Sequence, residues 1–379
     1  MDFTLSKEHQ MLQKLYQDFA EREVKPLAAE LDEEERFPDE TLVKLRQNGM
    51  MGVSYPKEYG GQGCDMLANV LLIEEIAKVC ATTAVILAVH SSLVPSILLK
   101  HGSEEQKQKY LTPLMKGDYL GAFAITEANA GTDAAAQQTK ADRDGDYYIL
   151  NGSKLFITNA GKADVYLVLA VTDKTKRSRG ISAFVIEKGM EGFTIGPKEK
   201  KMGLRGSSTC EIIFENCKVP KENRIGAEGK GYSIALGALD IGRIGIAAQA
   251  LGIAEGAFDE TVQYVKERKQ FGKPLAAFQN TQFTLAAMKA KIDAAKLLVY
   301  RAALAKDNQK VFSLEAATAK LFASETAMEV TTQFLQLFGG YGYMRDYPIE
   351  RMMRDAKITQ IYEGTSEVQK MVISSTVLK

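Results

Sequence analysis

The chain lacks several residue types on which common kinds of site depend. It contains no tryptophan, only three histidines and only four cysteines in 379 residues. The histidines are too scattered for a shared metal site, and His90 lies in an apolar run that favours a packed core imidazole. The cysteines show neither a C-x-x-C spacing nor the density of a disulfide scaffold, which indicates reduced thiols. Metal catalysis and a disulfide framework are therefore not expected.

The chain also lacks net charge and a long uninterrupted apolar run. Its 48 basic residues balance 48 acidic ones, so nucleic acid and anionic membranes are not expected as partners. The longest apolar segment, 84–99, is interrupted by His90, two serines and Pro95, and predicts a buried helix rather than a membrane insertion. The start, MDFTLSKEHQ, is unlike a targeting peptide, and a cytoplasmic location is expected.

Two glycine-rich phosphate cradles are missing as well. The sequence contains neither G-x-G-x-x-G nor G-x-x-x-x-G-K. A nicotinamide dinucleotide on a Rossmann fold is therefore disfavoured.

The sequence pattern changes from helical to β-rich and back to helical along the chain, which predicts an α+β protein of three domains. The expected domains are a helical block, 1–118, a β-rich block, 119–225, and a second helical block, 226–379. The middle block is expected to form a small antiparallel barrel or sandwich, with turns at Asp144-Gly145 and Asn151-Gly152. Its expected strands are 121–126, 146–152, 154–159, 164–171, 181–187 and 208–214. The expected helices of the last block are 231–268, 276–306, 313–338 and 366–376.

The segment QIYEGTSEVQ, 360–369, holds a candidate general base. Glu363 lies between Tyr362 and Gly364, and apolar surroundings would raise its pKa toward neutrality, as abstraction of a weakly acidic C–H proton requires. Taken alone, an isolated Glu-Gly pair is more often a solvated turn, and the other segments of the chain overturn that reading.

Four further segments could bind a ligand. FAITEANAGTD, 123–133, offers the hydroxyls of Thr126 and Thr132, and KLFITN, 154–159, offers an aromatic wall with a polar neighbour. ERKQFGKPL, 267–275, supplies a guanidinium suited to a pyrophosphate, and QLFGGYGY, 336–343, has glycines that permit close backbone approach. Each of these has an ordinary structural reading too: a turn, a core residue, a surface ion pair and a helix end.

Taken together, the segments resemble the acyl-CoA dehydrogenase family over the whole chain, and most closely its short-chain, butyryl-CoA-type members. Five separated signatures carry the resemblance: FAITEANAGTD, KLFITN, LDIGRIG at 239–245, RKQFG at 268–272 and YEGTSEVQ at 362–369. The resemblance implies an N-terminal helical domain, a β-domain and a C-terminal four-helix bundle. It further implies a homotetramer, a dimer of dimers with one FAD per subunit, and an electron-transferring flavoprotein as redox partner.

The resemblance also assigns roles to residues. Glu363 would remove the α-proton of a short-chain acyl-CoA while the β-hydrogen passes to flavin N5 as hydride. The residues placed at FAD are Phe123, Ala124, Ile125, Thr126, Gly131, Thr132, Phe156, Ile157, Thr158, Arg268, Phe271, Gln279, Gln336, Leu337, Gly339, Gly340, Thr365, Ser366 and Glu367. Those placed at the substrate are Thr132, Asp240, Ile241, Gly242, Arg243 and Gly364. Without the family, Asp240 and Arg243 are equally an ion pair on one helix face.

Three positions qualify the resemblance. Some relatives carry their base where this chain has Gly242, which leaves Glu363 as the matching carboxylate. Ala128 replaces a usual loop proline and Phe156 a common tryptophan, so loop stiffness and flavin stacking are expected to differ. A branched, aromatic or glutaryl thioester, the reverse reduction of crotonyl-CoA, and a non-catalytic flavin-binding homologue remain alternatives. A purely structural scaffold gives no reason for the β-block.

Overall fold

The computed structural model describes residues 4–309 and 311–379 and shows helices, then a β-sheet, then helices along the chain. The α+β prediction is confirmed. The domain boundaries expected at 118/119 and 225/226 stay a prediction.

The N-terminal block is helical and supplies much of the core. Its helices are α1 (Lys7–Phe19), α2 (Ala28–Glu33), α3 (Asp39–Gln47), α4 (Met66–Val79), α5 (Ala81–His101), α6 (Glu104–Gln106) and α7 (Thr112–Lys116). The Asp65 carboxylate begins α4 by accepting from the N–H of Ala68, as an N-cap does. His90 is fully buried in α5, where its ring contacts the Leu114 carbonyl and the Gly121 N–H, and burial lowers its pKa to about 4. The prediction of a packed core imidazole is confirmed.

The middle block forms one sheet that the sequence predicted in part. Its strands are β1 (Gly121–Ala124), β2 (Lys140–Asp144), β3 (Tyr147–Thr158), β4 (Val165–Val171), β5 (Ile181–Glu187), β6 (Phe193–Lys198), β7 (Thr209–Pro220) and β8 (Arg224–Ile225). The order is β6-β7-β3-β2-β4-β5-β8, and β1 pairs with β4. The sheet is not wholly antiparallel, because β1 and β2 each run parallel to β4.

One expected turn is wrong. Asp144-Gly145 does join two strands, but Asn151-Gly152 lies inside β3, where the pairing with β7 shifts register. Gly152 has φ 139°, and its hydrogen faces Thr139 so closely that a Cβ would collide. The glycine therefore marks a β-bulge rather than a strand end, and 146–152 and 154–159 are one strand.

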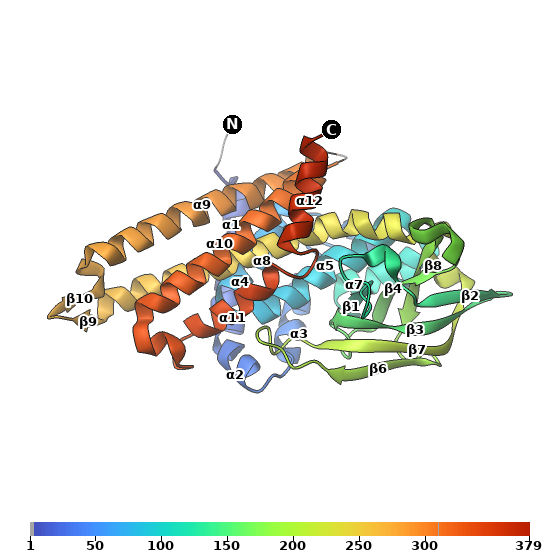
Figure 1. Cartoon of the computed structure of the whole chain (residues 1–379), viewed down its shortest axis with the longest axis horizontal. Coiled ribbons are helices and arrows are strands. Elements are labelled where there is room, and N and C mark those ends of the chain that lie inside the picture. The colour runs from blue at the N-terminus through green and yellow to red at the C-terminus, as the bar shows by residue number, and fades with distance from the viewer. Residues whose placement is uncertain (1–3, 310) are drawn as a thin grey trace.

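The C-terminal block consists of long helices packed side by side. They are α8 (Gly231–Glu267), α9 (Gln279–Asn308), α10 (Ser313–Phe338), α11 (Ile349–Thr359) and α12 (Ser366–Val377), and a small hairpin joins β9 (Lys269–Gln270) to β10 (Lys273–Pro274). Helices α8, α9 and α10 run along the long axis of the molecule, with the sheet at one end and the hairpin at the other (Figure 1). Helix α11 was not foreseen from the sequence.

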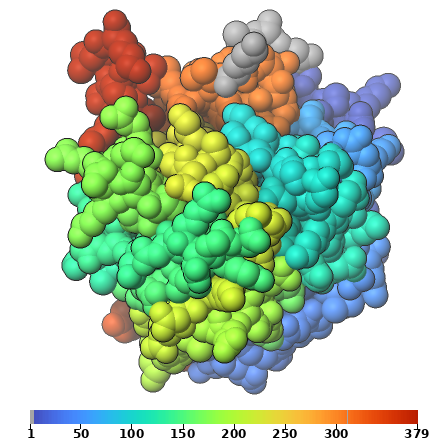
Figure 2. Space-filling view, turned by 90° about the vertical axis from the view of Figure 1, so that its right-hand side faces the viewer, coloured from blue at the N-terminus to red at the C-terminus, as the bar shows by residue number. Residues whose placement is uncertain are grey.

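The three blocks share one interior. Helix α8 packs against α4, α5 and α10, and α5 also covers β1, so the largest apolar cluster continues from the bundle to one face of the sheet. Figure 2 shows the sheet end, where the green middle block lies beside the cyan and blue N-terminal one. Within the described residues, α5 and α8 are long and apolar enough to cross a membrane, yet 89% and 72% of their most apolar stretches are buried. Core helices show the same burial, so this is weak evidence for a membrane span.

Candidate active site

Glu363 lies in a short turn between α11 and α12 that is tied to the rest of the fold. Thr365 begins α12 as its N-cap, and the Ser366 N–H donates to the Gln360 carbonyl across the turn at 2.9 Å. The Tyr362 hydroxyl donates to the Gln249 side chain on α8, which itself donates to the Ala81 carbonyl at 3.0 Å. The turn is therefore anchored to both α8 and α5.

The Glu363 side chain is partly buried, and one of its two carboxylate oxygens lacks a hydrogen-bond donor in the described part of the chain. Its Oε2 is buried and has no partner among the described residues. Burial raises the pKa of Glu363 to about 7, while the nearby charges of Lys320 and Arg243 act in the opposite direction. A carboxylate with this environment can take a proton from a weak acid near neutral pH.

Gly242 on α8 makes room for that carboxylate. A Cβ built at Gly242 would collide with Oε2 of Glu363 and would lie 3.0 Å from both its Cδ and Cδ2 of Leu93. Any larger residue at this position would have to displace the carboxylate. The structure thus brings together two positions that the sequence singled out separately.

Asp240 and Arg243 form the ion pair that their spacing allows. The Arg243 guanidinium donates to Asp240 at 2.6 Å, and the Ser313 hydroxyl donates to the other Asp240 oxygen at 2.5 Å. The Nε of Arg243 is buried and has no partner among the described residues. This free N–H can donate to an acceptor atom of a ligand. The role of Asp240 and Arg243 in substrate binding stays a prediction, and their ion pair is a structural contact.

A first cavity, of about 320 Å³, opens beside the turn. It is lined by Phe156 and Thr158 of β3, by the 199–209 segment, and by Ile361 and Tyr362. Phe156 has φ 59° and is 63% exposed, an unusual backbone conformation that presents an aromatic ring to the cavity. Ile157 instead packs into the sheet core, so its side chain does not line this cavity.

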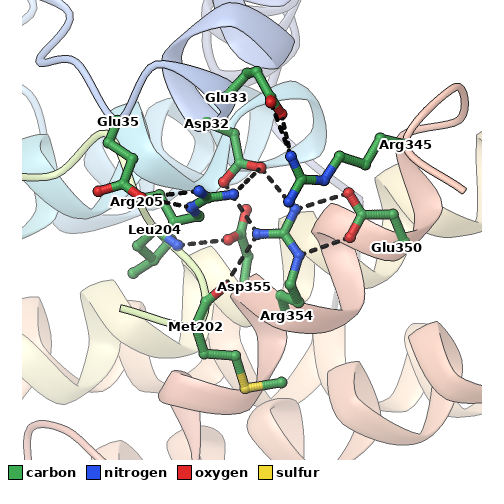
Figure 3. Close-up of polar contacts among 10 residues, drawn as sticks. All are labelled: Asp32, Glu33, Glu35, Met202, Leu204, Arg205, Arg345, Glu350, Arg354 and Asp355. Carbon is green, nitrogen blue, oxygen red and sulfur yellow. Dashed lines mark hydrogen bonds and ion pairs between the residues drawn. The ribbon is translucent and has the colours of Figure 1, made fainter. Parts of the chain in front are cut away.

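The wall of this cavity is fixed by a charged junction between the three blocks (Figure 3). The Arg354 guanidinium on α11 donates to Asp32 at 2.7 and 3.1 Å and to the Met202 carbonyl at 3.1 Å. The Leu204 N–H donates to Asp355 at 2.6 Å. The 202–204 segment is therefore attached to the helix that precedes the Glu363 turn.

The segment 121–132 leaves the sheet beside β3, where the Leu155 N–H donates to the Thr126 carbonyl at 2.8 Å, and it does not line the first cavity. Phe123 and Ala124 are buried in β1, Ile125 and Thr126 are half-buried, and Gly131 and Thr132 are exposed. The loop is held by the fully buried Lys154, which donates to the Ile125 carbonyl at 3.3 Å and to Glu127 at 2.7 Å. Glu127 also accepts the N–H groups of residues 138 and 139. These bonds restrain a loop that lacks the usual proline.

A second cavity, of about 470 Å³, holds another part of the expected set. Arg268, Gln336, Leu337, Gly339 and Gly340 line it, and the Arg268 guanidinium lies 5.2 Å above the Tyr341 ring. No atom lies within 4 Å of a Cβ built at either glycine, which leaves open space for a ligand against the backbone. Phe271 and Gln279 are exposed nearby in the chain.

The two cavities are separate within one chain. They share no lining residue, and the second lies at the hairpin end of the bundle, away from the sheet (Figure 1). Thr365, Ser366 and Glu367 are at the start of α12, next to Glu363, and Glu367 is exposed. Within the described residues, no group of three or more His, Cys, Asp or Glu side chains could hold a metal ion.

Sequence reasoning missed three residues around Glu363. Gln249 and Gln369 contact the turn through hydrogen bonds, and Lys320 donates to the Gly364 carbonyl. One sign was available for Lys320, because it is the only charged residue in AATAKLFA, 316–323. A single cation on a helix of small and apolar residues indicates a buried lysine with a specific partner.

Comparison with known proteins covers all three blocks. Family models match in order: acyl-CoA dehydrogenase N-terminal domain at residues 6–118, middle domain at 122–217 and C-terminal domain at 229–378. A short-chain specific acyl-CoA dehydrogenase of Clostridium acetobutylicum is 58% identical over 379 residues and is covered in full, as is this chain.

Two solved structures agree along the whole length. Butyryl-CoA dehydrogenase of Megasphaera elsdenii is 51% identical with a TM-score of 0.98, each chain covered in full. A structure from work on the electron transferring flavoprotein of Acidaminococcus fermentans and flavin-based electron bifurcation is 52% identical with a TM-score of 0.99, again with full coverage. With three domain models matched in order and a relative this similar over its full length, the chain belongs to the acyl-CoA dehydrogenase family.

Proposed function

We propose that this protein catalyses FAD-dependent α,β-dehydrogenation of a short-chain acyl-CoA, with butyryl-CoA and crotonyl-CoA as the saturated and unsaturated partners. The observation that carries the proposal is the buried, unpartnered Oε2 of Glu363 opposite Gly242. Its near-neutral pKa suits a base that must take a carbon-bound proton and later release it. The similarity to the Clostridium acetobutylicum and Megasphaera elsdenii enzymes supports a four-carbon acyl chain.

In this mechanism the chain's own groups bind, orient and remove a proton. The Glu363 carboxylate takes the α-proton, and its backbone N–H donates to the thioester carbonyl, which makes that proton more acidic. Gly242 leaves room for the carboxylate of the base. FAD, when bound, supplies the acceptor for the β-hydrogen as hydride.

Features of both cavities fit FAD. The exposed Phe156 ring and the Thr158 hydroxyl suit the flavin, in place of the more common tryptophan. Arg268 and the open backbone at Gly339 and Gly340 suit the diphosphate and adenosine. Because the two cavities share no lining residue within one chain, we propose that a second copy completes each site, as in a homotetramer built as a dimer of dimers.

The redox partner is proposed to be an electron-transferring flavoprotein. The similarity to the Acidaminococcus fermentans structure supports this choice and is compatible with reduction of crotonyl-CoA as well as oxidation of butyryl-CoA. A non-catalytic flavin-binding homologue would have no need of a Glu363 with a left-handed backbone and a buried, unpartnered Oε2. Branched, aromatic or glutaryl thioesters remain to be separated from butyryl-CoA by turnover.

The test is an anaerobic titration of the purified yellow protein with acyl-CoAs of four to eight carbons. Butyryl-CoA should bleach the flavin band most completely, and the Glu363→Gln variant should bind the same thioester and stay yellow. A parent protein that contains FAD but is not bleached by any thioester of the panel would overturn the proposal. Stronger bleaching by a longer or branched chain would keep the reaction and change the substrate.

A further inference from the structure

Lys320 on α10 is a buried cation to which the mechanism above gives no role. Its side chain is fully buried, and its Nζ donates to the Gly364 carbonyl at 2.5 Å. The Gln369 side chain donates to the same carbonyl at 2.7 Å from α12. Two donors, one charged and one neutral, therefore converge on the peptide that follows the base.

The carbonyl they hold belongs to a turn in an uncommon conformation. Glu363 and Gly364 have φ angles of 55° and 92°, so two consecutive residues lie in the left-handed region. For a glutamate this conformation is unfavourable and must be imposed by its surroundings. The bonds to the Gly364 carbonyl fix the peptide plane, and with it the direction in which the Glu363 side chain leaves the turn.

The charges that face the Glu363 carboxylate come from two helices. Arg243 lies on α8, and Lys320 lies on α10. Arg243 is already paired with Asp240 at 2.6 Å, whereas no carboxylate hydrogen-bonds to Lys320 within the described residues. Tyr362, in the same turn, is kept neutral because burial raises the pKa of its hydroxyl. Lys320 therefore acts on Glu363 together with Arg243, and of the two it is the one without a hydrogen-bonded carboxylate in the described chain.

The effect is mutual. Burial lowers the pKa of Lys320 to about 7, and the Glu363 charge opposes that change. Each group is therefore ionised more readily when the other is ionised.

We propose that Lys320 is a positioning residue for proton abstraction: it orients the base through the Gly364 carbonyl, and its buried charge beside the turn acts on the Glu363 carboxylate. The inference rests on the proposed function of Glu363 as the base. An electrostatic role of Lys320 changes how activity depends on pH, whereas a purely structural role does not. The pH profile therefore distinguishes the two.

Two variants separate these roles. Lys320→Gln removes the charge and leaves an amide that can donate to the Gly364 carbonyl, whereas Gln369→Leu removes a donor to that carbonyl and leaves the charge. We expect Lys320→Gln to move the acid limb of the kcat/KM profile with butyryl-CoA upward by about one pH unit, roughly a tenfold loss below its midpoint. The loss should diminish at alkaline pH. Gln369→Leu should lower kcat/KM equally at all pH values.

A loss of the same size at every pH in Lys320→Gln, as in Gln369→Leu, would reduce Lys320 to a structural contact and overturn the proposal. FAD content and circular dichroism establish that each variant is folded. Should Lys320→Gln not fold, Lys320→Arg tests the same point, since arginine keeps its charge throughout. The midpoint of the acid limb of its kcat/KM profile should lie at the same pH as in the parent or at a lower pH. A midpoint at a higher pH would contradict the inference.

A titration without turnover distinguishes failure of this inference from failure of the proposed function. Infrared difference spectra between the substrate-free holoenzyme and its Glu363→Gln variant report protonation of the Glu363 carboxyl directly. Its midpoint should rise in the Lys320→Gln background, and an unchanged midpoint would overturn the inference. A parent that does not oxidise acyl-CoA but shows the rise would refute the function and leave the electrostatic coupling standing.

Discussion

Two acidic side chains on either side of α11 have opposite surroundings. Asp32, on α2, accepts two hydrogen bonds from the Arg354 guanidinium of α11 at 2.7 and 3.1 Å (Figure 3). The Arg205 guanidinium lies 3.9 Å from the same carboxylate. Glu363, in the turn that follows α11, has an Oε2 without any partner in the described part of the chain. The same functional group is a stabilising element in one place and a reactive one in the other.

The difference lies in what compensates the lost hydration. At Asp32 a planar guanidinium replaces water with two charge-assisted hydrogen bonds. At Glu363 the cations Lys320 and Arg243 lie nearby without a hydrogen bond to the carboxylate, so burial has the largest effect on its pKa. A buried carboxylate left without donors is costly in the free energy of folding and, for that reason, reactive. Four predictions, made with three substitutions, test this contrast.

The largest effect is expected from Glu363→Gln on catalysis. The amide keeps the shape but cannot take a proton, so kcat/KM with butyryl-CoA should fall by about 10²- to 10⁴-fold. Stopped-flow flavin reduction measures the loss, and FAD content and thioester binding serve as controls. Turnover within tenfold of the parent would remove Glu363 from its role as the base.

The same substitution should stabilise the fold at alkaline pH. Because the folded-state pKa of Glu363 is raised from 4.5 to about 7, the cost of burying its charge is absent below pH 4.5 and complete above pH 7. Glu363→Gln should therefore gain at most about 3 kcal/mol at pH 8, less whatever the unpartnered amide costs. Thermal unfolding midpoints of parent and variant should converge as the pH falls toward 4.5. A variant less stable than the parent at pH 8 would contradict the account.

Neutralising the paired carboxylate should have the opposite sign. Asp32→Asn removes one of the two carboxylates paired with the half-buried Arg354 guanidinium, which keeps Glu350, and should destabilise the fold by about 1–3 kcal/mol at pH 8. The matched control is the adjacent Glu33→Gln, whose ion pair with Arg345 is 61% exposed on both sides and should matter little. Equal thermal midpoints for the two variants would show that the junction in Figure 3 does not stabilise the protein.

The smallest effect is expected from adding one methyl group at Gly242. The new Cβ would displace the Glu363 carboxylate, and we expect about a tenfold loss of kcat with little change in stability, since 1.4 kcal/mol corresponds to that factor. Gly245→Ala on the same helix is the control, because its Cβ would lie 3.5 Å from Ala88, an ordinary contact. Similar kcat values for both variants would show that the carboxylate does not need the space at Gly242.

The sequence predicted features that depend on neighbouring residues better than features that depend on residues far apart in the chain. The apolar run 84–99 located α5, the helical segments 231–268 and 313–338 located α8 and α10, and short β-rich runs located β4 and β5, because these signals lie within a few consecutive residues. Asn151-Gly152 was misread as a turn because a β-bulge and a hairpin use the same residues. Helix α11 was missed although its neighbouring turn was the most informative segment of the chain.

The sequence by itself determined the order of helical, β and helical blocks, the family, and Glu363 as the candidate base, because each is written in local patterns or in contiguous motifs. Only the tertiary structure decided that Gly242, Lys320 and Gln249 surround this carboxylate and that Arg354 neutralises Asp32 instead. These residues are distant in sequence, and the loss of water that raises the pKa of Glu363 arises only when α8, α10 and the turn pack together.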